Sequence, residues 1–93
     1  GAGAGAAPAA PSDLAIVSWS GRMANMRFRD NSNNEEGFEV LVSGGVYRRL
    51  GANDTTFQVG PGCGSTYSVR VRAVNAAGAS AASNTINVRG RCP

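Results

Sequence analysis

Hydrophobic and polar residues alternate with a period of two along most of the chain after Ser12. The clearest run spans residues 66–74, where apolar side chains fall on odd positions and mainly polar ones on even positions. Side chains of a β-strand point alternately to two faces, so each such run predicts a strand with one face in a core. No stretch keeps apolar residues at helical spacing, so helices are not expected.

Seven strands are predicted, at residues 13–19, 23–29, 37–43, 46–50, 55–59, 66–74 and 84–90. The segments between them carry turn residues, such as Gly44-Gly45 and the polar run from Asp30 to Glu36. Short strands separated by turns at this spacing are typical of a β-sandwich or a small barrel.

Composition divides the chain into two parts. Residues 1–11 contain only Gly, Ala and Pro, which bury too little apolar area to offset ordering the backbone, so a linker or tail is predicted. Alternatively, these small residues would lie as an extended strand against another sheet. Residues 12–93 are predicted to form one domain, because 93 residues suffice for only one core.

Charge and residue usage exclude several classes of function. All nine cations are arginines against six acids, and they are spread from Arg22 to Arg91, so nucleic-acid binding is not expected. The chain has no His and no Lys, so neither an enzyme nor a bound cofactor is expected. No run of 18 apolar residues and no leader pattern occurs, so no membrane insertion is expected and the sequence is interpreted as a mature or excised segment.

Two stretches carry a resemblance to a known family. Residues 28–40, FRDNSNNEEGFEV, resemble the second strand, polar turn and third strand of fibronectin type III domains of secreted bacterial proteins. Residues 67–80, YSVRVRAVNAAGAS, are similar to the sixth strand and the loop that follows it, and PSDL at 11–14 resembles the opening strand. The resemblance covers most of the chain and implies an all-β, seven-stranded immunoglobulin-like sandwich.

The same resemblance implies roles for three aromatic residues. Phe28 and Phe38 would lie in the core between the sheets, and Tyr67 would form the tyrosine corner, with its hydroxyl bonded to upstream backbone. Two positions depart from the family pattern: Phe28 stands where Trp is usual, and Pro61 stands where Leu is usual. We therefore expect Val59 to supply the apolar contact of the missing leucine.

Cys63 and Cys92 are the clearest candidate pair. If strands 66–74 and 84–90 form a hairpin around Gly78, these two residues lie side by side beyond its open end. A structural disulfide is the favoured interpretation; a pair of free thiols and metal binding are the alternatives. A disulfide would indicate an oxidising compartment, and hence an extracellular or cell-surface location.

Two charged regions invite functional interpretations. The acids between Asp30 and Glu36 suggest Ca²⁺, but the segment lacks EF-hand spacing, and a polar turn capped by its own side chains is favoured. Arg70, Arg72 and Arg89 would share an outward sheet face with Glu39, either as a weak anion or glycan contact or in cross-strand ion pairs.

The leading functional hypothesis is a non-catalytic extracellular module that acts as a spacer or interaction domain within a larger secreted or surface protein. Its expected partners are neighbouring domains or protein subunits, and polysaccharide is a further candidate. The first alternative is a self-assembling structural subunit, of a filament or surface layer, in which residues 1–10 add as a strand to a neighbour. A weaker alternative is a carbohydrate-binding module, for which Trp19 and Tyr47 are the candidate exposed aromatics. Loop 75–80 contains no Arg-Gly-Asp, so integrin binding is not carried over from the family.

Overall fold

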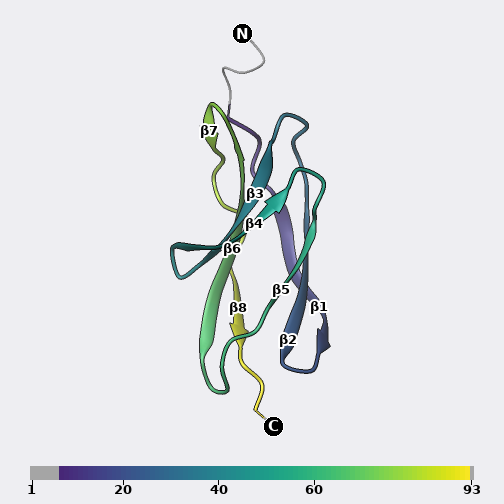
Figure 1. Cartoon of the computed structure of the whole chain (residues 1–93), viewed down its shortest axis with the longest axis vertical. Coiled ribbons are helices and arrows are strands. Elements are labelled where there is room, and N and C mark those ends of the chain that lie inside the picture. Colours follow the sequence, from purple (N-terminus) through teal and green to yellow (C-terminus); the bar gives the residue numbers. More distant parts are fainter. Residues whose placement is uncertain (1–6, 93) are drawn as a thin grey trace.

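A computed structural model describes residues 7–92 and shows an all-β sandwich of two antiparallel sheets (Figure 1). Within that range the chain contains no helix that would span a membrane. The strands are β1 (Ser12–Ser20), β2 (Met23–Arg29), β3 (Gly37–Val42), β4 (Gly45–Gly51), β5 (Thr56–Val59), β6 (Thr66–Asn75), β7 (Gly78–Ala79) and β8 (Ile86–Arg89). The predicted sandwich fold is confirmed, and all seven predicted strands are present.

The two sheets differ in size. The smaller has the order β1-β2-β5, and the larger has the order β4-β3-β6, with both β7 and β8 paired to β6. β3 and β6 are therefore the interior strands of the larger sheet, and β6 pairs with three others. β3 pairs with it over six positions, from Gly37 opposite Val74 to Val42 opposite Val69.

The last edge of the larger sheet is broken into two pieces, which the sequence did not predict. Val74 of β6 pairs with Ala79, and Val69 of β6 pairs with Ile86. The edge therefore uses seven positions where β6 uses five, and the two extra residues make the segment between β7 and β8 bulge. Two serine side chains accept hydrogen bonds from backbone N–H groups of β6 across this gap. The backbone N–H of Ala73 donates to Ser80 Oγ at 2.9 Å, and that of Val71 donates to Ser83 Oγ at 3.0 Å. Hydroxyl oxygens thus replace the carbonyl acceptors of a regular strand.

The core lies between the sheets and is centred on three phenylalanines. Phe28 and Phe38 are 4% and 1% exposed, and their rings meet edge to face at a centroid distance of 4.9 Å. Phe57 packs on Phe28 at 6.2 Å. Valines from β3, β5, β6 and β8 fill the remaining space, because their alternating side chains point inward: Val40, Val59, Val69, Val71 and Val88.

Tyr67 does not form the hydrogen bond expected of a tyrosine corner. Its ring is half-buried at the margin of the core and packs against Tyr47 at 5.9 Å, while its hydroxyl makes no hydrogen bond to any residue between 7 and 92. In the upstream backbone, Gly62 O accepts from Ser65 N at 2.8 Å, in a turn that lies against Gly90. Val59 is fully buried in the core cluster, where the missing leucine contact was expected.

The end of the Gly/Ala/Pro segment lies on the domain. Pro8 and Pro11 are buried, and Asn31 Nδ2 donates to Ala10 O at 3.0 Å and to Ser12 Oγ at 2.8 Å. The chain is therefore held against the β2–β3 loop before β1 begins. The rest of the predicted linker, residues 1–6, lies outside the described residues.

Candidate interaction face

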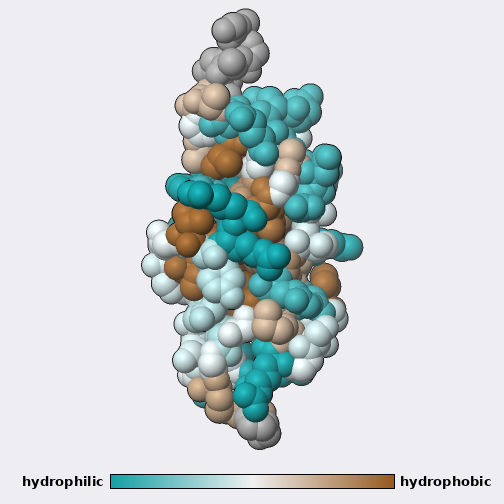
Figure 2. Space-filling view, in the orientation of Figure 1, coloured by the Kyte–Doolittle hydropathy of each residue, from teal (hydrophilic) through white to brown (hydrophobic). Residues whose placement is uncertain are grey.

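The outer side of the larger sheet carries the arginines singled out in the sequence. Arg70 and Arg72 alternate with buried residues of β6, and the register places Arg72 opposite Glu39 and Arg70 opposite Leu41. Arg89 lies opposite Thr66, further along the same face. We call this surface the arginine face, made of Glu39, Leu41, Arg49, Arg70, Arg72 and Arg89. Figure 2 shows hydrophilic surface across the middle of the molecule, with hydrophobic surface beside it, where Figure 1 places β3, β4 and β6.

Glu39 is the centre of an ion-pair triad on the arginine face. Its Oε1 lies 2.6 Å from Arg72 Nη2, and its Oε2 lies 3.3 Å from Arg49 Nε. The Glu39 side chain is only 11% exposed, whereas that of Arg49 is 79% exposed. The hydrogen bond from Arg72 lowers the pKa of Glu39 below its ordinary value, against the opposing effect of desolvation. The predicted cross-strand ion pairing with Glu39 is thus present for Arg72.

Because the folded protein lowers the pKa of Glu39, this carboxylate stabilises the fold above the ordinary glutamate pKa. That contribution is lost as the pH falls through the lowered pKa of the folded state. We expect Glu39→Gln to reduce the free energy of unfolding at pH 7 by about 1 kcal/mol and to flatten its decline in acid. Urea unfolding between pH 7 and pH 2 measures both effects, with Glu36→Gln, on an exposed loop residue, as the control. Parallel pH curves for the wild type and Glu39→Gln would contradict the role of the triad.

The rest of the arginine face has an excess of positive charge. Among residues 7–92, no carboxylate is within ion-pair distance of Arg70 or Arg89. Leu41 points outward yet is only 7% exposed, and it lies between Val46 of β4 and Arg70 of β6. The methylene groups of arginine commonly cover apolar surface while the guanidinium stays in water. The chemistry of this face therefore suits a polar or anionic partner.

The two candidate aromatics for carbohydrate stacking lie on different sheets. Tyr47 on β4 is 44% exposed, but one side of its ring packs on Tyr67. Trp19 on β1 is half-buried, and the Arg91 guanidinium lies 4.1 Å from its ring centroid. These two rings do not form the planar row that polysaccharide stacking would use.

The polar turn at residues 30–36 is held by its own side chains. Asp30 Oδ1 accepts from the backbone N–H of Ser32 at 3.0 Å, and Ser32 Oγ donates to Glu35 Oε2 at 2.6 Å. The predicted capping of this turn is thus present at Asp30. Across the part of the chain that the structure describes, no group of three or more His, Cys, Asp or Glu side chains is placed to hold a metal ion.

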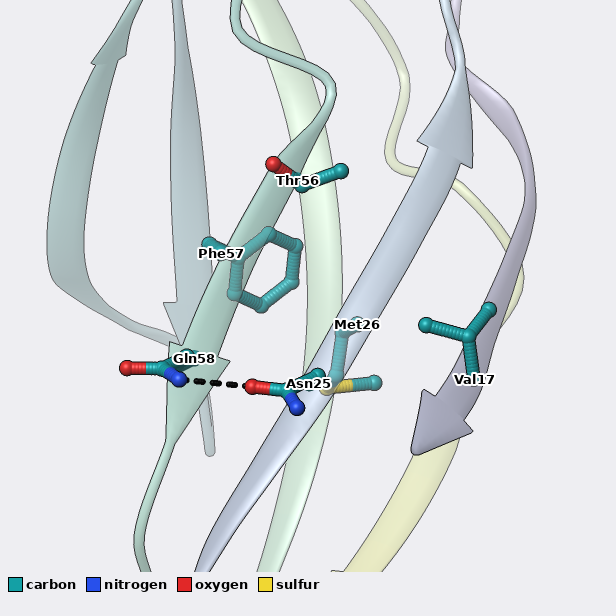
Figure 3. Close-up of a pocket in the computed structure, with 6 residues that line it drawn as sticks. All are labelled: Val17, Asn25, Met26, Thr56, Phe57 and Gln58. Atoms are coloured by element: carbon teal, nitrogen blue, oxygen red, sulfur yellow. Dashed lines mark hydrogen bonds between the residues drawn. The ribbon is translucent and has the colours of Figure 1, made fainter. Parts of the chain in front are cut away.

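A shallow hollow on the outer side of the smaller sheet was not predicted (Figure 3). Its polar rim is a row of hydrogen bonds across three strands: Gln58 Nε2 donates to Asn25 Oδ1 at 2.6 Å, and Asn25 Nδ2 donates to Ser18 and Ser20. Val17, 54% exposed, stands on the far side of the hollow, at an irregularity of β1 between Ile16 and Ser18. The polar groups are already paired with each other, so this row stabilises the sheet.

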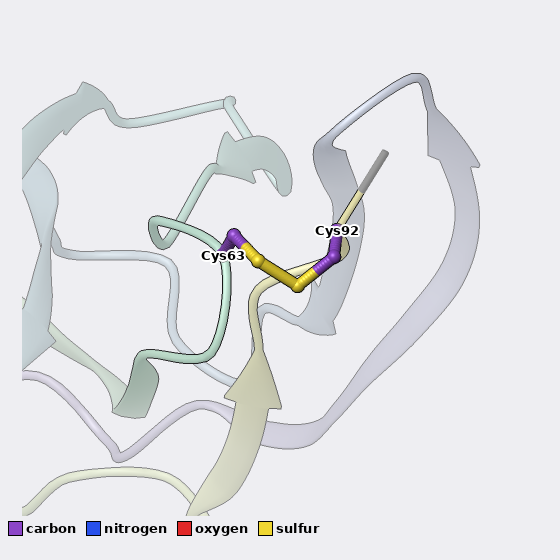
Figure 4. The surroundings of a disulfide bond; sticks show 2 residues. All are labelled: Cys63 and Cys92. Carbon is purple, nitrogen blue, oxygen red and sulfur yellow. A yellow bond between two sulfur atoms is a disulfide. The ribbon is translucent and has the colours of Figure 1, made fainter.

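The predicted disulfide is present, between Cys63 and Cys92 (Figure 4). Their Cα atoms are 4.7 Å apart, and the β6–β8 register continues toward them from the pair Thr66 and Arg89. Gly90 lies directly against the turn before Cys63, where a Cβ would meet the carbonyl oxygens of Pro61 and Gly62. Its backbone N–H donates to Ser65 O at 2.7 Å. The C-terminal segment is thus fixed to the β5–β6 turn by a covalent bond and by close backbone packing.

No protein-family model and no curated protein matches the chain. Solved structures with similar folds include the chicken CNTN1 FN1–FN3 domains, with a TM-score of 0.74 and 18% identity over 92% of this chain and 32% of that one. The Clostridium perfringens spore cortex lytic enzyme SleM gives a TM-score of 0.70 and 16% identity over 88% of this chain and 28% of that one.

A structure described as a myokine gives a TM-score of 0.64 and 17% identity over 92% of this chain and the whole of that one. The chain spans about a third or less of the first two structures named above. At these identities the likeness concerns the fold, and it agrees with the strand order and the core described above. The chain has a fibronectin type III-like fold.

Proposed function

We propose that this domain is a non-catalytic extracellular module that serves as a spacer and interaction unit within a larger secreted or surface protein. The observation that carries the proposal is that the first and last described residues lie at opposite ends of the long axis (Figure 1). A module with this arrangement adds its length to a chain of modules joined end to end.

Fixed ends support the spacer role. At one end Pro8 and Pro11 are buried and Ala10 O is hydrogen-bonded to Asn31. At the other end Cys92 is bonded to Cys63, and Arg91 lies over the ring of Trp19. Neighbours attached close to such points are restricted in direction, whereas neighbours on frayed ends are not.

The similar structures and the disulfide support the proposal that the domain is part of a larger extracellular protein. The chicken structure is described as containing several FN domains, and this chain matches about a third of it. The spore cortex lytic enzyme is a bacterial protein in which the matching part is a fraction of a longer chain. A disulfide that closes the C-terminal end favours an oxidising, extracellular compartment. The absence of His and Lys from the sequence favours a non-catalytic role.

The spacer role is tested with two copies joined directly in one chain and measured by small-angle X-ray scattering. We expect an extended particle whose maximum dimension is close to twice that of the single copy. A compact particle with the two copies side by side would contradict the spacer role.

The alternative, a self-assembling subunit, stays a prediction because residues 1–6 lie outside the described residues. We expect the single chain to be monomeric by light scattering, both intact and after deletion of residues 1–6. This deletion leaves the buried Pro8 and Pro11 in place, so it does not disturb the domain. Large species that form with the intact chain and vanish on deletion would favour assembly through the tail.

A further inference from the structure

The C-terminal strand is a short edge strand of the larger sheet. β8 has four residues, pairs with β6 alone and ends at Arg89. Without the disulfide, a pull on the chain beyond Arg89, directed away from the domain, would act along β8 and load this short pairing, the hydrogen bond from Gly90 N–H to Ser65 O and the contact of Arg91 with Trp19. A short edge strand with one neighbour is the first element expected to separate.

The disulfide moves such a pull away from β8. Cys92 is bonded to Cys63, which lies three positions before β6 begins at Thr66 (Figure 4). A pull on Cys92 therefore passes through the sulfur atoms to Cys63, which lies between the end of β5 at Val59 and the start of β6. β6 has ten residues and is paired with β3, β7 and β8. The force thus reaches the segment that leads into the most extensively paired strand of the sheet.

The opposite end of the domain is held by a pair of hydrogen bonds. β1 begins at Ser12 at the other end of the long axis, and a pull on the residues before it acts along the strand (Figure 1). Besides its pairing with β2, β1 is tied to the other sheet by Asn84. The backbone N–H of Leu14 donates to Asn84 Oδ1 at 2.9 Å, and Asn84 Nδ2 donates to Leu14 O at 3.0 Å. Both bonds join the same residue of β1 to the same side chain, so they are loaded together when β1 is pulled away from Asn84.

We propose that this domain bears tension between its two ends, with the Cys63–Cys92 bridge passing the force to the segment that joins β5 and β6, and the Asn84–Leu14 pair holding β1. The proposal rests on the spacer role, because a module is pulled at both ends only when it lies between other parts of a chain or assembly. It adds that the spacer resists extension, and it assigns that resistance to two specific connections.

The bridge also limits how far the domain lengthens once it unfolds. Cys63 and Cys92 are separated by 29 positions, and the chain between them cannot extend while the bridge is intact. An extended chain spans at most about 3.3–3.6 Å per residue, so the bridge withholds roughly 100 Å of length. This difference in unfolded length identifies which molecules in a pulling experiment carry the bridge.

The first test is single-molecule force spectroscopy with handles at the two ends of the full chain. Wild-type oxidised protein is compared with the double variant Cys63→Ser and Cys92→Ser. We expect the double variant to unfold at lower force and to lengthen by roughly 100 Å more. Equal unfolding forces, with the length difference present, would show that the bridge does not carry the load and would overturn the proposal.

The second test uses Asn84→Ala, with Asn87→Ala as the matched control, because the Asn87 side chain on β8 is exposed and accepts from Ser68 Oγ within the same sheet. Loss of the two Leu14 bonds should make unfolding at constant end-to-end force roughly tenfold faster, whereas the control should change it little. Any ordinary loss of stability acts in every pulling direction. We therefore repeat the measurement with handles at Asn33 and the C-terminal end, which leaves β1 unloaded.

A smaller acceleration in this second direction supports the proposal, and an equal acceleration in both directions overturns it. The two proposals fail separately. An extended tandem whose end-to-end resistance is unaffected by the bridge or by Asn84 would keep the spacer role and reject tension bearing. A compact, side-by-side tandem would reject the spacer role whatever the unfolding force.

Discussion

Phe28→Ala is expected to lower the free energy of unfolding by about 3–5 kcal/mol, the usual cost of truncating an aromatic side chain in a packed core. Phe28 is 4% exposed and contacts both Phe38 and Phe57, so its removal leaves a cavity between the sheets that neither partner can fill without moving. Small domains have about 5–15 kcal/mol of stability in total, so the loss would take a large share of it.

Urea or thermal unfolding measures the change, with Val17→Ala as the control on the same sheet. Val17 is 54% exposed, and its truncation should cost no more than about 0.5 kcal/mol. A loss of less than about 1 kcal/mol at Phe28 would mean that its ring does not fill the core, and the register of β2 would then be wrong by one residue.

The sequence predicted the strands well where burial alternates. In β2 and β6 every second side chain is buried, so the hydrophobic pattern maps directly onto the two faces. β3 shows the limit of this rule. Glu39 and Leu41 point away from the core but are nearly as buried as Phe38 and Val40, because residues of β4 and β6 cover them. Such burial depends on neighbouring strands and leaves no periodic signal.

The broken edge at β7 and β8 was missed for a related reason. The hydroxyl groups of Ser80 and Ser83 accept hydrogen bonds from backbone N–H groups of β6. The edge segment therefore needs no regular alternation of apolar and polar residues there. Asn84 contacts Leu14 across 70 positions of sequence, and an asparagine between serine and threonine indicates only a loop. The hydrogen bond of Tyr67 was expected from the family resemblance alone, and in the turn after Pro61 the Gly62 carbonyl accepts from Ser65 N instead.

The arginine face was predicted apart from Arg49, and ion pairing with Glu39 was predicted and is present for Arg72. Alternation along β6 placed Arg70 and Arg72 on the outer side, and Glu39 was expected beside them. The sequence did not indicate that Arg49 would share the same carboxylate, since it belongs to a strand whose side chains are almost all exposed. Glu39 is paired with both Arg49 and Arg72, so Arg70 and Arg89 are the cations of this face that are available to a partner.

The disulfide was predicted because it follows from the hairpin register, and its removal has the second large expected effect. The double variant Cys63→Ser and Cys92→Ser should lose roughly 3–4 kcal/mol of unfolding free energy, the amount that a closed loop of about 30 residues contributes by restricting the unfolded chain. Intact-mass measurement of the non-reduced wild type should first show the loss of two hydrogens. Two free thiols in protein from its native compartment would remove both the bridge and the argument for an extracellular location.

The same variant separates restriction of the unfolded chain from support of the folded one. Both Cys63 and Cys92 are exposed, so replacing them with serine creates no cavity, and the core around Phe28 should be unchanged. If the bridge acts mainly through the unfolded state, the backbone amide chemical shifts of β6 in the folded variant should stay as in the wild type, with changes only in β8 and near Gly90. Changed chemical shifts throughout the larger sheet would instead mean that the bridge holds β6 in place, and solution stability and resistance to force would then have the same origin.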